Sequence, residues 1–90
     1  MDRARQIEMV IRAASAGSFA KAATSLNLTP SAVSHAIADL EKELRVTLFY
    51  RTTRHIKLTV DGEDFCRRGR EILDKLSELD AAASHSRTRL

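Results

Sequence analysis

Two short amphipathic helices are predicted within residues 18–37, and only a very short connection separates them. Ser18 can cap the first helix with its hydroxyl, and Thr29 followed by Pro30 is a strong start for the second. Asn27 tolerates the left-handed conformation that ends a helix abruptly. Helices joined so tightly must cross at close range, and this spacing predicts a helix-turn-helix.

The residues between the two helices and those on the outward face of the second helix also fit a helix-turn-helix. Ala23 is small where the two helices cross, and Val33 buries the second helix on the first. In a helix-turn-helix the second helix enters the major groove of DNA by its N-terminal residues. A plain helical hairpin in a protein core is the alternative. The outward face of the second helix is small, polar and free of acids, and it consists of Ser31, Ser34, His35 and Ala38.

Two further apolar stripes at helical spacing predict the rest of a three-helix core. The first helix should end near Gly17, which accepts positive φ. Its stripe is Ile7, Val10, Ile11 and Ala14, and the stripe of the helix that starts at Pro30 is Val33, Ile37, Leu40 and Leu44.

Residues 48–59 lose the helical period and predict a β-hairpin. Ile56 and Leu58 alternate with polar residues, and a polar turn lies at about Thr52 to Arg54. A hairpin after a helix-turn-helix forms a wing. We therefore predict a mainly α fold, a winged helix-turn-helix domain over residues 1–59.

The basic charge of the chain is concentrated on this part of it. The net charge is +3, from 15 basic and 12 acidic residues. Residues 45–60 contain no acid, and clustered basic charge of this kind indicates nucleic-acid binding. A solvated charged loop is the alternative interpretation. The basic residues of the segment are Arg45, Arg51, Arg54 and Lys57.

A long helix is predicted to follow the wing, over residues 60–83. Its apolar residues repeat by alternating steps of four and three, which is typical of a helix that packs on another helix. Residues 84–90 have no apolar period, and we expect this tail to fray. The residues of the seam, which we take as a dimer interface, are Phe65, Gly69, Ile72, Leu76, Leu79 and Ala83.

Other functions have little support in the sequence. No apolar run reaches the roughly 18 residues of a membrane span, and a single cysteine, Cys66, fits a reducing cytoplasm. The histidines lie too far apart for a metal site. Ser34, His35 and Asp39 lie within about one and a half helical turns, without an oxyanion hole. We therefore expect a cytoplasmic protein that is not an enzyme, with no catalytic residue, no metal and no cofactor.

A family resemblance supports this interpretation. The stretch from Leu26 to Ile37, LNLTPSAVSHAI, closely resembles the N-terminal domain of LysR-type transcriptional regulators. The resemblance extends over residues 1 to about 83, and it implies a winged helix-turn-helix followed by a linker helix that dimerises. Further matching residues are Gly17, Ser18, Phe19, Ala22, Ala23, Leu40, Glu41, Leu44, Leu48, Phe49, Arg51, Leu58, Thr59 and Gly62.

The resemblance also implies which residues contact DNA. The recognition helix would read bases through positions matching Pro30, Ser31, Ser34 and His35, with Thr29 near the phosphates. We predict that Thr29 to Ala38 meet the major groove and that the wing arginine, Arg54, meets the minor groove. Four further residues are predicted to contact the phosphate backbone: Ser18, Lys21, Arg51 and Lys57.

Two residues depart from the family pattern. Arg45 stands where the family usually has glycine, and a left-handed arginine there would be strained by about 1 kcal/mol. The helix would otherwise have to end differently. His35 stands where arginine is frequent, so a bidentate contact to guanine is lost.

The predicted partner is double-stranded DNA, bound by a homodimer at an inverted repeat. The alternative is a protein-interaction module, for instance a fragment that dimerises with a full-length regulator. Family members continue into an effector-binding domain, so a small-molecule effector is expected only if such a domain exists. The sequence leaves open whether these 90 residues are a complete protein or part of a longer one.

Overall fold

The computed structural model describes residues 2–52 and 55–88. The helices and strands form a winged helix-turn-helix followed by a long helix, which confirms the predicted fold. The two strands pair as an antiparallel hairpin. Along the chain the elements are α1 (Arg3–Ala16), α2 (Phe19–Leu26), α3 (Pro30–Leu44), β1 (Phe49–Arg51), β2 (Ile56–Leu58) and α4 (Val60–Thr88).

The predicted capping residues define the helix-turn-helix. The Ser18 hydroxyl accepts a hydrogen bond from the backbone N–H of Lys21, and the Thr29 hydroxyl accepts one from that of Ala32. Asn27 ends α2 in the left-handed conformation, at a φ of 56°. These local interactions satisfy backbone groups that a helix terminus leaves free, and they hold the turn between α2 and α3 short.

The end of α3 also has a left-handed residue. Arg45 has a φ of 56° and a ψ of 45°, and its backbone N–H points to the carbonyls of Glu41 and Lys42. The helix therefore ends in the conformation that glycine adopts most easily, with an arginine in its place.

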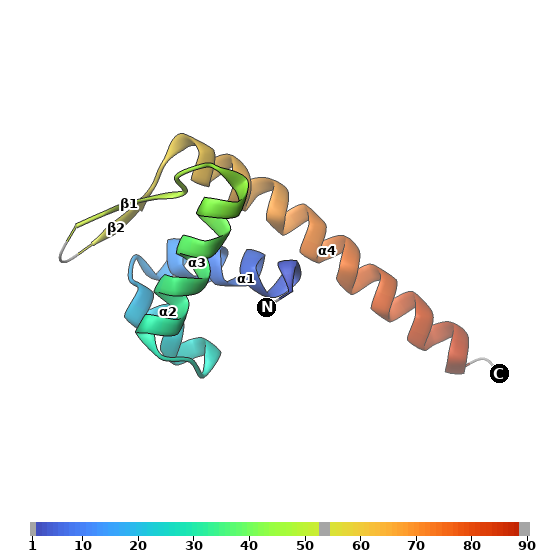
Figure 1. The fold of residues 1–90 in the computed structure, drawn as a ribbon. Helices are drawn as coiled ribbons and strands as arrows, with labels where there is room; N and C mark the ends of the chain where they lie inside the picture. Colours follow the sequence, from blue (N-terminus) through green and yellow to red (C-terminus); the bar gives the residue numbers. More distant parts are fainter. Residues whose placement is uncertain (1, 53–54, 89–90) are drawn as a thin grey trace.

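The first three helices surround the core, and α4 lies across α1 (Figure 1). The molecule measures 54 × 26 × 21 Å, because the distal part of α4 extends away from the body. The hairpin projects from the other side of the body (Figure 1). The buried core consists of Val10, Ala13, Ala22, Ala23, Val33, Ile37, Leu40, Leu48, Phe49 and Cys66.

The predicted core differs from the structure in two places. Met9 and Ala13 of α1 are fully buried, whereas the predicted Ile11 and Ala14 are only partly buried. Because α1 packs against both α4 and α2, its buried surface is wider than one stripe. Leu44 is 40% exposed, because it is the last residue of α3 and no further helical turn covers it.

Thr59 joins the base of the wing to α4. Its hydroxyl donates to the backbone carbonyl of Thr47 over 2.6 Å and accepts from the backbone N–H of Gly62 over 2.9 Å. The side chain therefore caps α4 and contacts the segment that leads into β1. This double contact fixes the direction in which α4 leaves the wing.

The long helix continues beyond the predicted end of its apolar period. We expected a frayed tail from Ser84, but α4 is helical to Thr88. Its last turns follow the run of alanines at 81–83, and alanine has the highest helix propensity. Among the described residues, α4 and the other helices lack the combination of length and apolar composition needed to cross a membrane.

Candidate nucleic-acid interface

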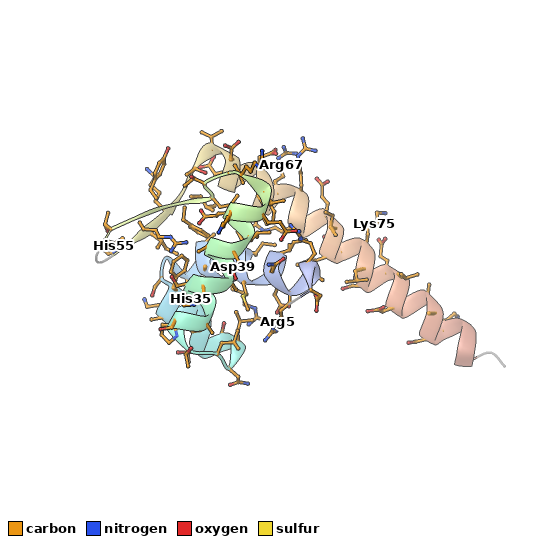
Figure 2. All side chains as sticks on the ribbon, viewed as in Figure 1. Arg5, His35, Asp39, His55, Arg67 and Lys75 are labelled. Atoms are coloured by element: carbon orange, nitrogen blue, oxygen red, sulfur yellow. The ribbon has the colours of Figure 1, made fainter. Side chains whose placement is uncertain are left out.

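The outward face of α3 is open to solvent over its N-terminal half. Pro30, Ser31, His35 and Ala38 are exposed, and Ser34 is half-buried. His35 lies on this part of α3, on the same side of the molecule as His55 of the wing (Figure 2). Neither acidic nor strongly basic side chains occur from Pro30 to Ala38. The face can therefore approach an anionic surface without burying a like charge.

The acidic residues of α3 lie towards its C-terminal end, and two of them are paired. Glu43 forms an ion pair with Arg3 of α1 over 2.7 Å, and Glu41 forms one with Arg51 of the wing over 3.0 Å. Asp39 is exposed. These pairs reduce the negative charge that α3 presents beside the wing.

The start of α2 contributes the predicted backbone contacts Ser18 and Lys21. The Ser18 hydroxyl oxygen already accepts a hydrogen bond from the backbone of Lys21, whereas the side chain of Lys21 is exposed. The Thr29 hydroxyl oxygen is used in the same way at the start of α3. Both hydroxyls keep a hydrogen that could be donated, so the caps do not exclude contact with phosphate.

The two described lysine and arginine residues of the wing are both exposed, but their side chains point in different directions. Lys57 is exposed on β2, opposite the exposed Tyr50 of β1. Arg51 instead directs its guanidinium at α3. Arg54, the predicted minor-groove residue, lies outside the described residues. The phosphate contact of Arg51 stays a prediction, and the structure shows that its guanidinium is engaged within the chain.

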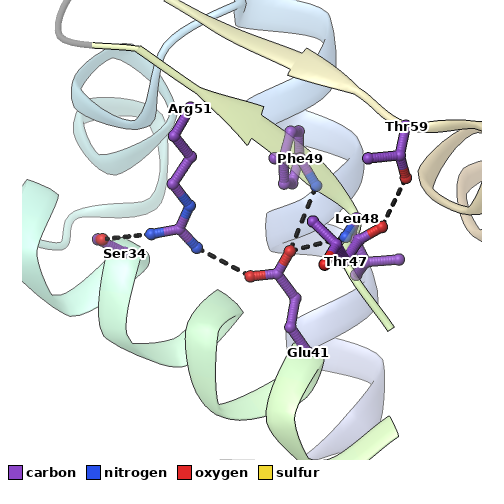
Figure 3. A network of polar contacts seen from close by, with 7 residues as sticks. All are labelled: Ser34, Glu41, Thr47, Leu48, Phe49, Arg51 and Thr59. Carbon is purple, nitrogen blue, oxygen red and sulfur yellow. Dashed lines mark hydrogen bonds and ion pairs between the residues drawn. The ribbon is translucent and has the colours of Figure 1, made fainter. Parts of the chain in front are cut away.

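Arg51 connects the wing to α3 (Figure 3). Its Nη1 donates to the Ser34 hydroxyl over 3.2 Å, and its Nη2 donates to Glu41 Oε1 over 3.0 Å. The guanidinium carbon lies 5.0 Å from the centre of the Phe19 ring, which packs edge-on against Phe49. One side chain therefore contacts α2, α3 and, through its own strand, the wing.

Glu41 matches the family pattern, but the sequence did not predict its contacts with the wing. Its Oε2 accepts from the backbone N–H groups of Leu48 and Phe49, over 2.7 and 3.3 Å, while Oε1 accepts from Arg51 (Figure 3). Hydrogen bonds to charged groups contribute about 1.5–3 kcal/mol each. The sequence pattern indicated only an acidic residue near the end of a helix. No neighbouring residue showed that its carboxylate binds the backbone N–H groups of Leu48 and Phe49.

Two arginines of α1 hold the end of α2 just before the turn. Arg5 donates to the carbonyl of Leu26 over 3.2 Å, and Arg12 donates to that of Ser25 over 3.3 Å. Cations near a helix C-terminus interact favourably with its free carbonyls. Because α3 starts shortly after this point, α1 helps to fix the position of α3.

The predicted seam on α4 divides into two parts. Phe65 is half-buried against the core, and Gly69 is buried: a Cβ there would lie 2.7 Å from Ile7 Cγ2. These two residues therefore pack within the chain, and the close approach that Gly69 permits is to α1. The exposed part consists of Ile72, Leu76, Leu79 and Ala83.

The exposed part borders an open groove between α4 and the start of α1. Leu73, which the seam pattern omitted, lines this groove of about 400 Å³ together with Leu76 and Ala4. Leu73 is half-buried, whereas Ile72 is 54% exposed and Leu79 is 63% exposed. This region has the largest exposed apolar side chains of α4.

The chemistry of a metal site or a reactive thiol is not supported. Within residues 2–52 and 55–88, His, Cys, Asp and Glu side chains do not gather in a group that could hold a metal ion. Cys66 is 1% exposed, and its burial raises the pKa of the thiol. The thiol is therefore a protonated packing group.

Comparisons with known proteins agree with this geometry. Residues 4–63 match the model of the bacterial regulatory helix-turn-helix proteins of the lysR family. YhjC, an uncharacterized HTH-type transcriptional regulator of Escherichia coli, is 39% identical over 80 residues, covering 89% of this chain and 27% of YhjC. The chain spans about a quarter of the length of the curated relatives it matches.

Solved structures of DNA complexes have the same fold. The chain superposes on the crystal structure of a CbnR_DBD–DNA complex with a TM-score of 0.89 and 30% identity, covering 96% of this chain and 98% of the other. A complex of BenM_DBD with catB site 1 DNA gives a TM-score of 0.88 and 26% identity, covering 94% and 93%.

Proposed function

Because the chain belongs to the lysR family of bacterial regulatory helix-turn-helix proteins, we propose that it binds double-stranded DNA as the sequence-reading part of a transcriptional regulator. The observation that carries the proposal is the exposed, acid-free face of α3, from Pro30 to Ala38, next to a wing that is also free of acids. The recognition helix enters the major groove. Arg54, which lies outside the described residues, meets the minor groove in this proposal.

Individual residues have separate roles in this proposal. Pro30, Ser31, Ser34, His35 and Ala38 meet base edges. Contacts to phosphate position the protein without reading sequence, and they come from Ser18, Lys21, Thr29 and Lys57. Arg51 is discussed separately below because its guanidinium is engaged within the chain.

We also propose that two copies pair through α4 and bind an inverted repeat in the cytoplasm. The support is the exposure of Ile72, Leu76 and Leu79 on one side of a helix that extends from the body. Solitary apolar residues are common on surfaces, but three at seam spacing favour a helical partner. A homodimer would present two recognition helices about one turn of DNA apart, or a multiple of it.

The test is selection of genomic DNA fragments by the purified chain at near-physiological salt, followed by sequencing. Salt is held constant because non-specific phosphate binding weakens steeply as salt rises. Enrichment of an interrupted inverted repeat is expected. A folded chain that enriches no sequence would overturn the proposal of sequence-specific DNA binding.

A pair of variants tests the assigned face. Ser31→Glu combined with His35→Glu adds negative charge to the exposed side of α3 and should abolish binding, because each carboxylate would face phosphates. The matched control, Ser15→Glu with Ala82→Glu, adds the same charge at exposed helical positions on α1 and α4. Unchanged binding by the α3 variant would show that the recognition face is assigned wrongly.

A further inference from the structure

Arg51 is placed differently from the other wing cation. Lys57 and Arg51 are both exposed, but the Arg51 guanidinium lies over the Phe19 ring, with its two terminal nitrogens directed at Glu41 and Ser34. Glu41 is itself fixed, because its other oxygen accepts from two backbone N–H groups and its side chain is only 15% exposed. The guanidinium is therefore held in one orientation from three sides.

This arrangement determines how Ser34 can bond. A serine hydroxyl has one hydrogen to donate and two lone pairs. Arg51 Nη1 occupies a lone pair over 3.2 Å, so the hydroxyl hydrogen must point away from the guanidinium. Two serine and threonine side chains of α2, Thr24 and Ser25, donate back to carbonyls of their own helix. In the described part of the chain, Ser34 makes its hydrogen bond to Arg51 instead.

We propose that Arg51 is a positioning residue for base recognition: by occupying one lone pair of the Ser34 hydroxyl, it turns the hydroxyl hydrogen outward, so that Ser34 donates preferentially to a hydrogen-bond acceptor on the DNA. This inference rests on the proposed function. Acceptors on base edges in the major groove are guanine O6 and N7, adenine N7 and thymine O4, whereas cytosine presents only an amino donor there. Ser34 therefore favours these acceptor groups over the amino group of cytosine at its contact point.

The proposal differs from a phosphate contact in a measurable way. A phosphate contact contributes affinity equally on all DNA sequences, and its loss lowers the salt dependence of binding by about one counterion. The charge of Arg51 is already balanced by Glu41. A positioning residue should instead change the preference at one base pair and leave the salt dependence unchanged.

The experiment selects binding sites from a random-sequence duplex pool with the wild-type chain and with Arg51→Lys, Ser34→Ala and the double variant. Lysine keeps the charge but lacks the planar fork that contacts two partners at once. We expect Arg51→Lys to weaken binding to the selected site about tenfold, comparable to one mismatched base pair. The preference should relax at the same base pair as in Ser34→Ala.

The double variant tests whether the two residues act together. Arg51→Lys should have little further effect when Ser34 is already alanine, because coupled residues are not additive. Lys57→Ala is the matched control: it should weaken binding on all sequences alike and reduce the salt dependence. Circular dichroism and thermal unfolding establish that each variant is folded. If Arg51→Lys does not fold, Glu41→Gln is used in its place.

Three outcomes would overturn the inference. If Arg51→Lys binds like wild type, or if its loss of binding is uniform across sequences as for Lys57→Ala, Arg51 does not position Ser34. If the wild-type chain itself selects no sequence, the proposed function fails and the inference fails with it. The last outcome can be told apart from the first two, because only it involves the unmodified chain.

Discussion

Gly62, in the first turn of α4, lies directly against the backbone carbonyl of Leu48: a Cβ at position 62 would stand 2.1 Å from that oxygen. The same turn is tied to the wing base through Thr59. Because the neighbouring atom is backbone, it cannot move aside as a flexible side chain would. Glycine is therefore required here for close approach.

We expect Gly62→Ala to lower the free energy of unfolding by about 3 kcal/mol, the upper part of the range for overpacking. Chemical denaturation of the wild-type protein and of Gly62→Ala measures this difference. Gly17→Ala is the control, because a Cβ there meets no atom within 4 Å and the cost comes only from its φ of 69°, about 1 kcal/mol. Equal midpoints for Gly62→Ala and wild type would contradict the close contact.

Arg45→Gly should raise the free energy of unfolding by about 1 kcal/mol, because glycine adopts the left-handed conformation without strain. Arg45 has a φ of 56° and is exposed, so little packing is lost. Asn27→Gly, at the same φ, is expected to gain less, since asparagine tolerates this conformation. Thermal unfolding compares the two, and a destabilised Arg45→Gly would show that the arginine side chain makes a compensating contact.

The Cys66 thiol should react slowly with an alkylating reagent in the native protein and rapidly in denaturant. Burial raises the pKa of this thiol, and the reactive thiolate is disfavoured. The folded state therefore holds the proton more tightly than the unfolded state. The resulting stability is fully present below the ordinary thiol pKa and is lost as pH rises through the raised pKa of the folded state. Fast modification of the native protein at neutral pH would contradict this prediction.

Leu76→Lys combined with Leu79→Lys should convert the proposed dimer to a monomer in sedimentation experiments. Leu76 is 41% and Leu79 63% exposed in the single chain, so the charges can reach solvent in the monomer but would be buried in a helix pair. Circular dichroism should still show a folded domain. Asp74→Lys with Ala81→Lys, also exposed, places lysines elsewhere around α4 and should leave the oligomer intact. If the protein with Leu76→Lys and Leu79→Lys stays dimeric, the dimer interface lies elsewhere.

The boundaries between α1, α2 and α3 could be predicted because each depends on a few neighbouring residues, whereas the end of α4 was placed too early. Gly17, Ser18, Asn27 and Thr29 all act as the sequence indicated. Left-handed φ values and side-chain caps are properties of a single turn, so they can be inferred without knowing the fold. The two strands of the wing were predictable from alternation for the same reason.

Contacts between distant segments could not be predicted in this way. Glu41 and Arg51 are ten positions apart, and only the folded wing brings them together. Gly69 follows the seam pattern, yet it packs on Ile7 of α1, more than sixty positions earlier. A repeat of apolar residues indicates that a face is covered, but it does not indicate whether the same chain or another covers it.

The contact between Gly69 and Ile7 has a consequence for how DNA sites would be distinguished. Because α4 is fastened there to α1 and at Thr59 to the wing, its outer half keeps a fixed direction relative to α3. Under the proposed pairing, side chains on α3 decide which bases are read. The number of residues from Gly69 to Leu76 decides the spacing between the two half-sites on the DNA. Each additional residue there would rotate the outer apolar face by about 100°, so base identity and site spacing can change independently.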